Sequence, residues 1–98
     1  MKSYSFTSKL WLYPGAQAAW HFITVPKKES ALIKEKHGKN ARGWGSLPVS
    51  VSIGKTTWQT SIFPDRKSGT YLLPVKADVR RKEGIEEGDT VGGSLAVR

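Results

Sequence analysis

The sequence predicts a mainly β fold, a small pseudo-two-fold β-barrel capped by two short helices. Three observations support this prediction. Polar and apolar residues alternate over several segments, as in strands that bury one face. Proline and glycine separate these segments at short intervals. The second half of the chain also repeats the pattern of the first at an offset of 48 residues. With 98 residues and no cysteine, the chain has the length of one domain and lacks a disulfide framework.

The first half is expected to run strand, strand, helix and loop. Residues 4–12 alternate, and their apolar face comprises Tyr4, Phe6, Leu10 and Leu12. Residues 20–25 are aromatic and β-branched, which predicts a second strand ended by Pro26. Residues 27–37 place a narrow apolar stripe, Ala31 to Ile33, among lysines and glutamates, which predicts a short helix. A basic loop punctuated by glycine follows over residues 39–45.

The second half opens on a predicted hairpin. Residues 47–53 and 56–62 alternate on either side of Gly54-Lys55, a pair typical of a two-residue type II′ turn. Pro48 lacks an amide donor, so its strand is expected to begin at an edge or a bulge. The remaining predicted elements are a turn over residues 64–69, a strand over 70–73, a helix over 75–82 ending at Gly84, a turn over 85–89 and a last strand over 90–97.

An internal repeat ties these elements into one domain over residues 1–98. Residues 26–49 and their counterparts 48 positions later share eight identities in 24 gapless positions. The repeat units extend over about 20–51 and 68–98, and each offers one strand face and one short helix. Because neither half can bury both alone, two halves in one chain would close a sheet and remove its edges. We therefore expect a monomer.

Three stretches carry a resemblance to a known family. Gly43 to Val49, Thr57 to Pro64 and Lys67 to Lys76 resemble the bacterial domain of unknown function 1905 family, as do Leu10-Trp11 and Trp20 with its neighbours. The resemblance covers essentially the whole chain. It implies a double-split β-barrel fold, in agreement with the barrel argued from the repeat, and it implies no particular activity.

A second resemblance is narrower. Leu73-Pro74, Val79 to Arg81 and Gly84 to Val91 are similar to the swapped-hairpin motif of AbrB and MazE type transcription factors, many of which bind DNA through basic side chains. The interval from Pro74 to Arg80 is longer than in that motif, and the first half lacks the Gly-Asp turn. The resemblance thus supports the barrel more than it supports DNA binding.

Charge is the clearest functional signal in the composition. Sixteen Lys and Arg against eight Asp and Glu give +8, of which residues 1–49 carry +6. Such a bias favours anionic partners, namely phosphates, nucleic acid or acidic proteins, although it can also serve solubility alone. No apolar run reaches the length of about 18 residues that a membrane segment needs. We expect a cytoplasmic protein without a membrane partner, which the lack of cysteine suits.

Catalytic and metal-binding motifs are not evident. His21 and His37 are the two histidines, and neither has a carboxylate at strand or helix spacing that would orient it. The sequence contains no HExxH or P-loop pattern. Two histidines 16 residues apart do not form a metal-ligand set. We expect no catalytic residues, no metal and no cofactor, and therefore not an enzyme.

Candidate binding residues fall into two groups. Anion-binding candidates are Lys36, His37, Lys39, Arg42 and Trp44 around the predicted loop, and Arg66, Lys67 and Tyr71 in the second half. Basic side chains neutralise phosphates and a neighbouring indole stacks on a base, as in sites for single-stranded nucleic acid. Two alternatives remain: Trp44 is a buried plug between glycines, and the lysines form a solvated helix face. Trp20 and Trp58, with Tyr71, are candidates for lining an apolar pocket, although aromatics in strands usually fill a core.

These observations favour a non-catalytic binding module that presents a basic loop rich in Gly and Trp to an anionic ligand or nucleic acid. The first alternative is a structural or protein-interaction domain in which charge serves only solubility. The second is a small-molecule-binding or enzymatic barrel.

Overall fold

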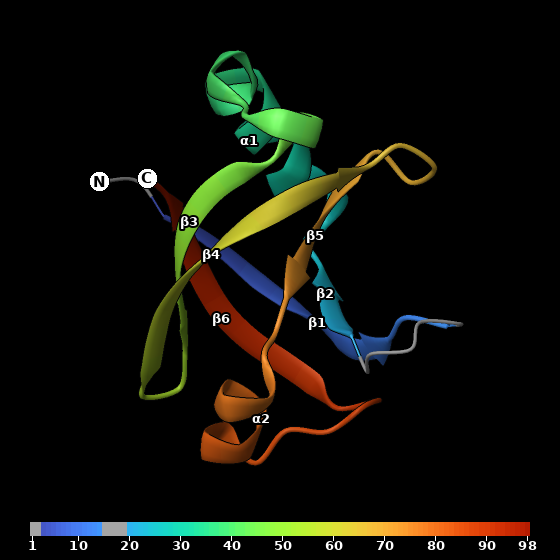
Figure 1. The fold of residues 1–98 in the computed structure, drawn as a ribbon, viewed down its shortest axis with the longest axis vertical. Helices are drawn as coiled ribbons and strands as arrows, with labels where there is room; N and C mark the ends of the chain where they lie inside the picture. Colours follow the sequence, from blue (N-terminus) through green and yellow to red (C-terminus); the bar gives the residue numbers. More distant parts are fainter. Residues whose placement is uncertain (1–2, 15–19) are drawn as a thin grey trace.

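Six antiparallel strands form a closed barrel in the order β1-β2-β5-β4-β3-β6 (Figure 1). The structure is a computed structural model and describes residues 3–14 and 20–98. The strands are β1 (Tyr4–Leu12), β2 (His21–Thr24), β3 (Leu47–Ile53), β4 (Thr56–Asp65), β5 (Thr70–Pro74) and β6 (Thr90–Val97). The helices are α1 (Lys27–His37) and α2 (Ala77–Glu83), with two 3-10 turns, η1 (Gly38–Asn40) and η2 (Gly43–Gly45). The predicted mainly β barrel with two short helices is confirmed.

The two longest strands change partner along their length. β1 pairs with β6 from Tyr4 to Lys9 and with β2 from Leu10 to Leu12. β4 pairs with β3 over residues 56–62 and with β5 over residues 63–65. The barrel is therefore split twice, beside the first part of β1 and beside the first part of β4. Each split adjoins a strand that leaves the sheet and leads into a helix, since β2 precedes α1 and β5 precedes α2.

The strand register has the symmetry that the internal offset of 48 describes. Exchanging β1 with β4, β2 with β5 and β3 with β6 maps the ring of pairings onto itself. In the β2–β5 pair Thr24 lies opposite Leu72, and in the β3–β6 pair Val49 lies opposite Val97. Both pairs join residues 48 positions apart, as expected where a two-fold axis crosses antiparallel equivalent strands. Duplication of an ancestral half remains a prediction about how this pattern arose.

The β3–β4 hairpin has the predicted geometry. All seven residues of β3 pair with β4, and its alternate residues are buried. Gly54 has φ +58°, whereas among the described non-glycine residues only Trp44 has a positive φ. A positive φ at the first turn residue alone fits a type II′ turn. The edge position expected from Pro48 is wrong, because β6 pairs along the other side of β3 and the Arg98 amide donates to the Pro48 carbonyl at 2.8 Å.

The barrel interior is aliphatic with a few aromatic rings. Its buried apolar residues include Tyr4, Phe6, Leu10, Ile23, Leu47, Val51, Trp58, Ile62, Leu73, Val91 and Leu95. Leu12 was expected on this buried face but is exposed, because β1 has by then passed the end of the core. Trp58 is the one tryptophan of the described residues with a buried side chain, so the expectation that strand aromatics fill the core fails for Trp20 and is met only partly by Trp11.

Helix α1 has the predicted bounds but buries a different stripe. Ile33 and Ser30 are buried, whereas Ala31 and Leu32 are exposed. The Ser30 hydroxyl donates to the Val25 carbonyl and accepts the Tyr71 amide, both at 3.0 Å. In a regular sheet the Tyr71 amide of β5 would donate directly to the Val25 carbonyl that follows β2, and the Ser30 hydroxyl bridges these two groups instead. Because both of its hydrogen bonds are satisfied, this polar side chain can lie in the core.

Two element boundaries in the second half differ from the prediction. Pro64 and Asp65 belong to β4, because they pair with Tyr71 and Thr70, so the turn is confined to residues 66–69. Helix α2 begins at Ala77 rather than Val75, and Gly84 ends it with φ +64°. The Val75 amide is used instead to hydrogen-bond the His21 carbonyl at 2.9 Å, which extends the sheet by one residue.

Candidate functional site

The loop between α1 and β3 carries the most exposed tryptophan on a hydrogen-bonded ring. We call residues 42–46 the Trp44 loop. The Arg42 amide donates to the Ser46 carbonyl and the Gly45 amide to the Arg42 carbonyl, each at 2.8 Å. The Ser46 hydroxyl and amide both donate to the Gly43 carbonyl, at 3.0 and 3.3 Å. Four hydrogen bonds within five residues make this a fixed platform, with Trp44 at its tip.

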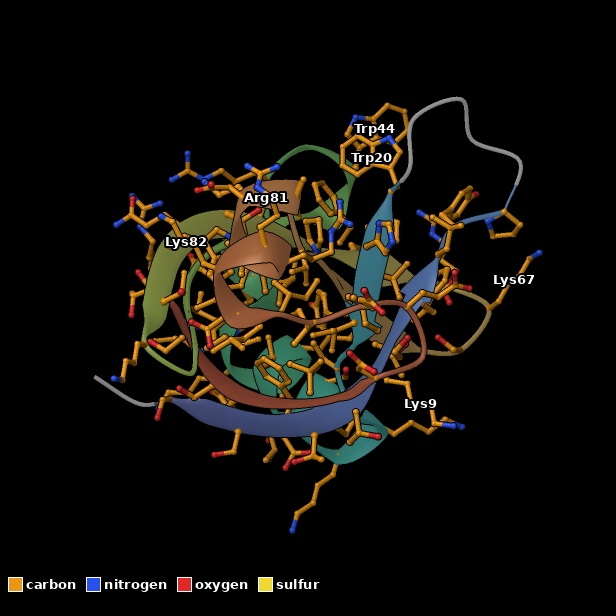
Figure 2. All side chains as sticks on the ribbon, turned by 90° about the horizontal axis from the view of Figure 1, so that it is seen from below. Lys9, Trp20, Trp44, Lys67, Arg81 and Lys82 are labelled. Carbon is orange, nitrogen blue, oxygen red and sulfur yellow. The ribbon has the colours of Figure 1, made fainter. Side chains whose placement is uncertain are left out.

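Trp44 is held in a conformation that side chains rarely adopt. Its φ is +64° and its ψ 13°, in the left-handed region, although it lies between two glycines that could take this conformation without strain. The side chain is 94% exposed and extends away from the barrel (Figure 2). The alternative of a buried plug is therefore wrong. A strained residue that gains no burial from its position is a common feature of functional sites.

A hollow of about 430 Å³ lies beside the Trp44 loop, and we call it the loop hollow. It separates the loop from the β4–β5 turn at the same end of the barrel (Figure 1). Its lining residues are Lys34, Gly38, Ala41, Gly45, Pro64, Asp65, Arg66, Gly69, Thr70 and Tyr71. The charged residues of this lining are two cations, Lys34 and Arg66, and one carboxylate, Asp65. The hollow thus lies between the two segments that carry the candidate groups, although of the candidates themselves only Arg66 and Tyr71 line it.

The Asp65 carboxylate holds the β4–β5 turn, which carries Arg66 and Lys67. Asp65 accepts the Lys67 amide at 3.3 Å and the Ser68 hydroxyl at 2.8 Å, so its role is that of a turn former, as its position predicts. Arg66 and Lys67 are consequently displayed at the tip, and both side chains are exposed. Tyr71 lies behind them with 5% of its surface exposed, and burial raises the pKa of its phenol.

Two predicted anion-binding residues do not belong to this site. The His37 Nε2 atom lies 3.3 Å from the Tyr4 hydroxyl, with the rings edge to face. Lys36 lines a separate hollow with Tyr4, Leu32 and Glu35. Helical rotation is the cause, because successive residues of a helix are turned by about 100° and Lys36 lies far around α1 from Lys34. Lys39, in η1, and Arg42, at the start of the Trp44 loop, are exposed.

The excess positive charge is spread over the molecule. In Figure 2, Lys9 and Lys67 extend outward on the right of the view, whereas Arg81 and Lys82 lie together on α2 toward the left. On α2, Asp78 accepts Arg81 and Lys82 at 3.3 Å each. The Lys82 hydrogen bond and charge, with smaller contributions from Arg81 and Lys76, lower the pKa of this exposed carboxyl. The charge therefore does not single out one face, and the site rests on the loop geometry.

Trp20 and Trp58 line a second hollow, at the end of the barrel that carries α2. Its volume is about 350 Å³. Tyr71, which was expected to join them, lines the loop hollow instead, because β5 leads from the one end of the barrel to the other. We call this second cavity the split hollow, since it adjoins the part of β4 that has no pairing with β5.

Sequence reasoning missed an exposed aromatic face on the outside of β1, β2, β5 and β4. The Phe22 ring lies between Trp11 and Trp20, with centroids at 5.3 and 6.1 Å, and the latter pair is stacked. The face comprises Trp11, Tyr13, Trp20, Phe22, Phe63 and Leu72, and five of these six surround a shallow hollow of about 380 Å³. Strand parity could have found it, because Phe22, Phe63 and Leu72 each lie next to a buried residue and so point outward.

Residues 3–14 and 20–98 hold no group of three or more His, Cys, Asp or Glu side chains placed to bind a metal ion. Within the same residues no helix has the length and apolar character that a membrane crossing requires.

Comparison with known protein families gives a match. The family model described as "Domain of unknown function (DUF1905)" matches residues 6–95, nearly the whole chain. The comparison with curated proteins gave no significant match.

Proposed function

Since the chain belongs to the DUF1905 family, whose description names no activity, we propose from its geometry that it is a non-catalytic module that binds single-stranded nucleic acid at the Trp44 loop. One observation carries the proposal. An indole that is 94% exposed is held by a hydrogen-bonded ring in a left-handed conformation. Burial does not account for this arrangement, whereas stacking of a nucleobase on a preorganised ring would.

The surroundings of the loop suit the phosphates of such a strand. Arg66 and Lys34 line the adjacent hollow. Lys39, Arg42 and Lys67 are exposed on the chain segments that contribute its other lining residues. Cations that track a backbone beside an aromatic platform are the usual design of sites for single strands. Asp65, the one carboxylate in the loop hollow, is engaged by the turn it anchors. The proposal places the protein in the cytoplasm, where its lack of cysteine suits a reducing environment.

Fluorescence anisotropy with labelled single-stranded and duplex DNA at two salt concentrations tests the proposal. We expect tighter binding of the single strand, with affinity that falls as salt rises. Loss of one base–indole stack predicts that Trp44→Ala weakens binding by roughly 5- to 100-fold. Leu12→Ala is the control, because it removes another exposed large apolar side chain, at the end of β1, that lines neither hollow. An affinity that does not change with salt concentration, or an equal loss of affinity in the two variants, would overturn the proposal.

A protein-interaction domain is the second candidate function, and the exposed aromatic face favours it. Contiguous apolar surface of this kind marks protein contacts in many monomeric proteins. The triple variant Lys39→Ala, Arg42→Ala and Trp44→Ala separates the two functions in the same DNA titration. A loss of affinity of tenfold or more supports the loop as the site. Unchanged affinity removes the loop from the function and favours the aromatic face.

A further inference from the structure

We propose that the split hollow, between β4 and α2, is a second binding site whose ligand is a small planar aromatic compound carrying a carboxylate or phosphate group. This goes beyond the nucleic-acid site, because the two hollows share no lining residue. Figure 1 shows α2 and the Trp44 loop at opposite ends of the barrel. The argument rests on the origin of the cavity, its aromatic walls and its charge.

The cavity arises from the split in the barrel. Trp58, Gln59 and Thr60 of β4 pair only with β3, and β4 meets β5 only from Phe63 onward. β5 meanwhile pairs with β2 up to Pro74, and the next amide, of Val75, follows it to the His21 carbonyl. The backbones of β4 and β5 therefore diverge from each other beside residues 58–60 of β4. The resulting hollow, about 350 Å³, is within the size range of sites for small ligands.

Two indoles form part of its wall. Trp58 is 8% exposed and belongs to the barrel core, so it offers a fixed surface. Trp20 is 53% exposed and stacks on Phe22 at an interplanar angle of 11°. Pro74 and Val75 add apolar atoms between them. A wall of indole and aliphatic groups favours a flat, apolar ring over a sugar or a peptide backbone.

The ionisable residues of the lining are all basic. His21, Lys76 and Arg80 line the hollow, and its ten lining residues include no aspartate or glutamate. The Arg80 Nε atom donates to the Val75 carbonyl at 3.2 Å, which anchors the guanidinium group through one nitrogen only. The two acids on the same helix have other partners. Asp78 pairs with Arg81 and Lys82, and Glu83 accepts the Thr56 hydroxyl at 2.6 Å. A positioned guanidinium group binds carboxylates and phosphates through paired hydrogen bonds.

The corresponding split beside β1 lacks these features. Helix α1 is 11 residues long against seven for α2, and it buries Ile33 and Ser30 there. Tyr4 of β1 contacts His37 of α1. The hollow that remains is lined by one carboxylate, Glu35, and one ammonium group, Lys36, with Tyr4 as its single ring. Only the hollow beside α2 therefore combines indole walls with basic side chains. The barrel architecture alone does not produce this combination, because the equivalent hollow beside α1 lacks it.

Calorimetry and NMR of the full chain test the proposal with two anions and their neutral counterparts. The probes are 2-naphthoate against 2-naphthalenemethanol, and AMP against adenosine. We expect at least one anion to bind tenfold or more tightly than its neutral counterpart and to shift the indole N–H signals of Trp20 and Trp58. Naphthoate alone would identify a carboxylate ligand, and AMP alone a phosphate ligand, and either result supports the site.

Variants on the two sides of α2 provide the control. Arg80→Gln and Lys76→Gln are expected to weaken binding by about tenfold, the effect of one charged hydrogen bond. Arg81→Gln, whose side chain pairs with Asp78, should change it less than twofold. Thermal melting of each variant confirms its folding. Equal losses for Arg80→Gln and Arg81→Gln, no binding of either anion at millimolar concentration, or shifts confined to Trp44 would each overturn the proposal.

Discussion

Replacement of Gly45 by alanine tests whether the Trp44 loop is a rigid part of the barrel. Gly45 has φ +76°, in the left-handed region, and an added Cβ atom would lie 2.9 Å from Cγ of Pro64 in β4. Gly43 is two residues away in the same loop, yet its φ is outside that region and a Cβ atom there meets nothing within 4 Å. Gly45→Ala and Gly43→Ala are therefore a matched pair with the same change in composition.

The expected magnitude follows from two terms. A left-handed alanine is less stable than glycine by about 1–2 kcal/mol. The contact at Pro64 adds about 1–2 kcal/mol, because a ring carbon of a paired strand cannot rotate away and the loop must shift. The sum, about 2–4 kcal/mol, corresponds to a fall in Tm of roughly 10 °C or more for a domain of this size. Gly43→Ala should leave Tm unchanged or raise it slightly, because it restricts the unfolded chain without strain.

Thermal unfolding by circular dichroism measures both variants, and DNA anisotropy measures whether the loop still binds. We expect Gly45→Ala to lose stability and affinity together, and Gly43→Ala to keep both. Melting of Gly45→Ala within about 2 °C of Gly43→Ala would show that the loop is not held against Pro64, and the reasoning from a fixed platform would fail.

Three further predictions concern single side chains. Trp44→Gly should keep or raise Tm, because glycine relieves the backbone strain at φ +64° and the exposed indole buries little area. The same variant should weaken DNA binding, and thermal melting and fluorescence anisotropy of one sample measure the two effects. Ser30→Ala should lower the free energy of unfolding by about 1–3 kcal/mol in urea titrations, because it orphans the Val25 carbonyl and the Tyr71 amide; a change below about 0.5 kcal/mol would contradict the bridging role. Asp78 has a lowered pKa in the folded state, so its contribution is present above the ordinary value of 3.8 and is lost as pH falls through the folded value. Asp78→Asn should remove this component of the acid sensitivity below about pH 3.8, and an unchanged pH profile would contradict it.

Oligomeric state gives a further prediction at the level of the whole chain. Because one chain closes its own barrel, sedimentation at micromolar concentration should show a monomer. An obligate dimer would indicate instead that a second copy covers the aromatic face, and Phe63→Ser would then restore the monomer.

Local patterns in the sequence were sufficient for most secondary structure. The bounds of α1 and β6, and the turn at Gly54, agree with the prediction because periodicity, proline and glycine act within a few residues. The role of Pro48 was predicted wrongly because its outer neighbour, β6, lies almost 50 residues away in the chain. Closure of a barrel is a long-range property, and a rule about edges does not apply once the edges have disappeared.

The candidate site was predicted in part for a related reason. Gly-Trp-Gly indicates a turn, but the choice of Trp44 rather than Gly43 for the left-handed position depends on the hydrogen bonds from Arg42 to Ser46. Proximity in sequence assigned Lys36 to the site, whereas the rotation of α1 brings Lys34 there. The approach of Arg66 to this loop depends on the β4–β5 pairing, which no local pattern encodes.

Pairing of β1 with β6 has a consequence for biosynthesis. β1, the first strand of the barrel to be synthesised, finds its main partner only in residues 90–95 of β6, the last strand of the barrel. β3 likewise needs residues 94–97 on its second side. Until then two strands keep free edges, which are templates for pairing with other nascent chains. The barrel must therefore fold after β6 has been synthesised, and a chain that stops before β6 would be prone to aggregate even though most of its core residues are present.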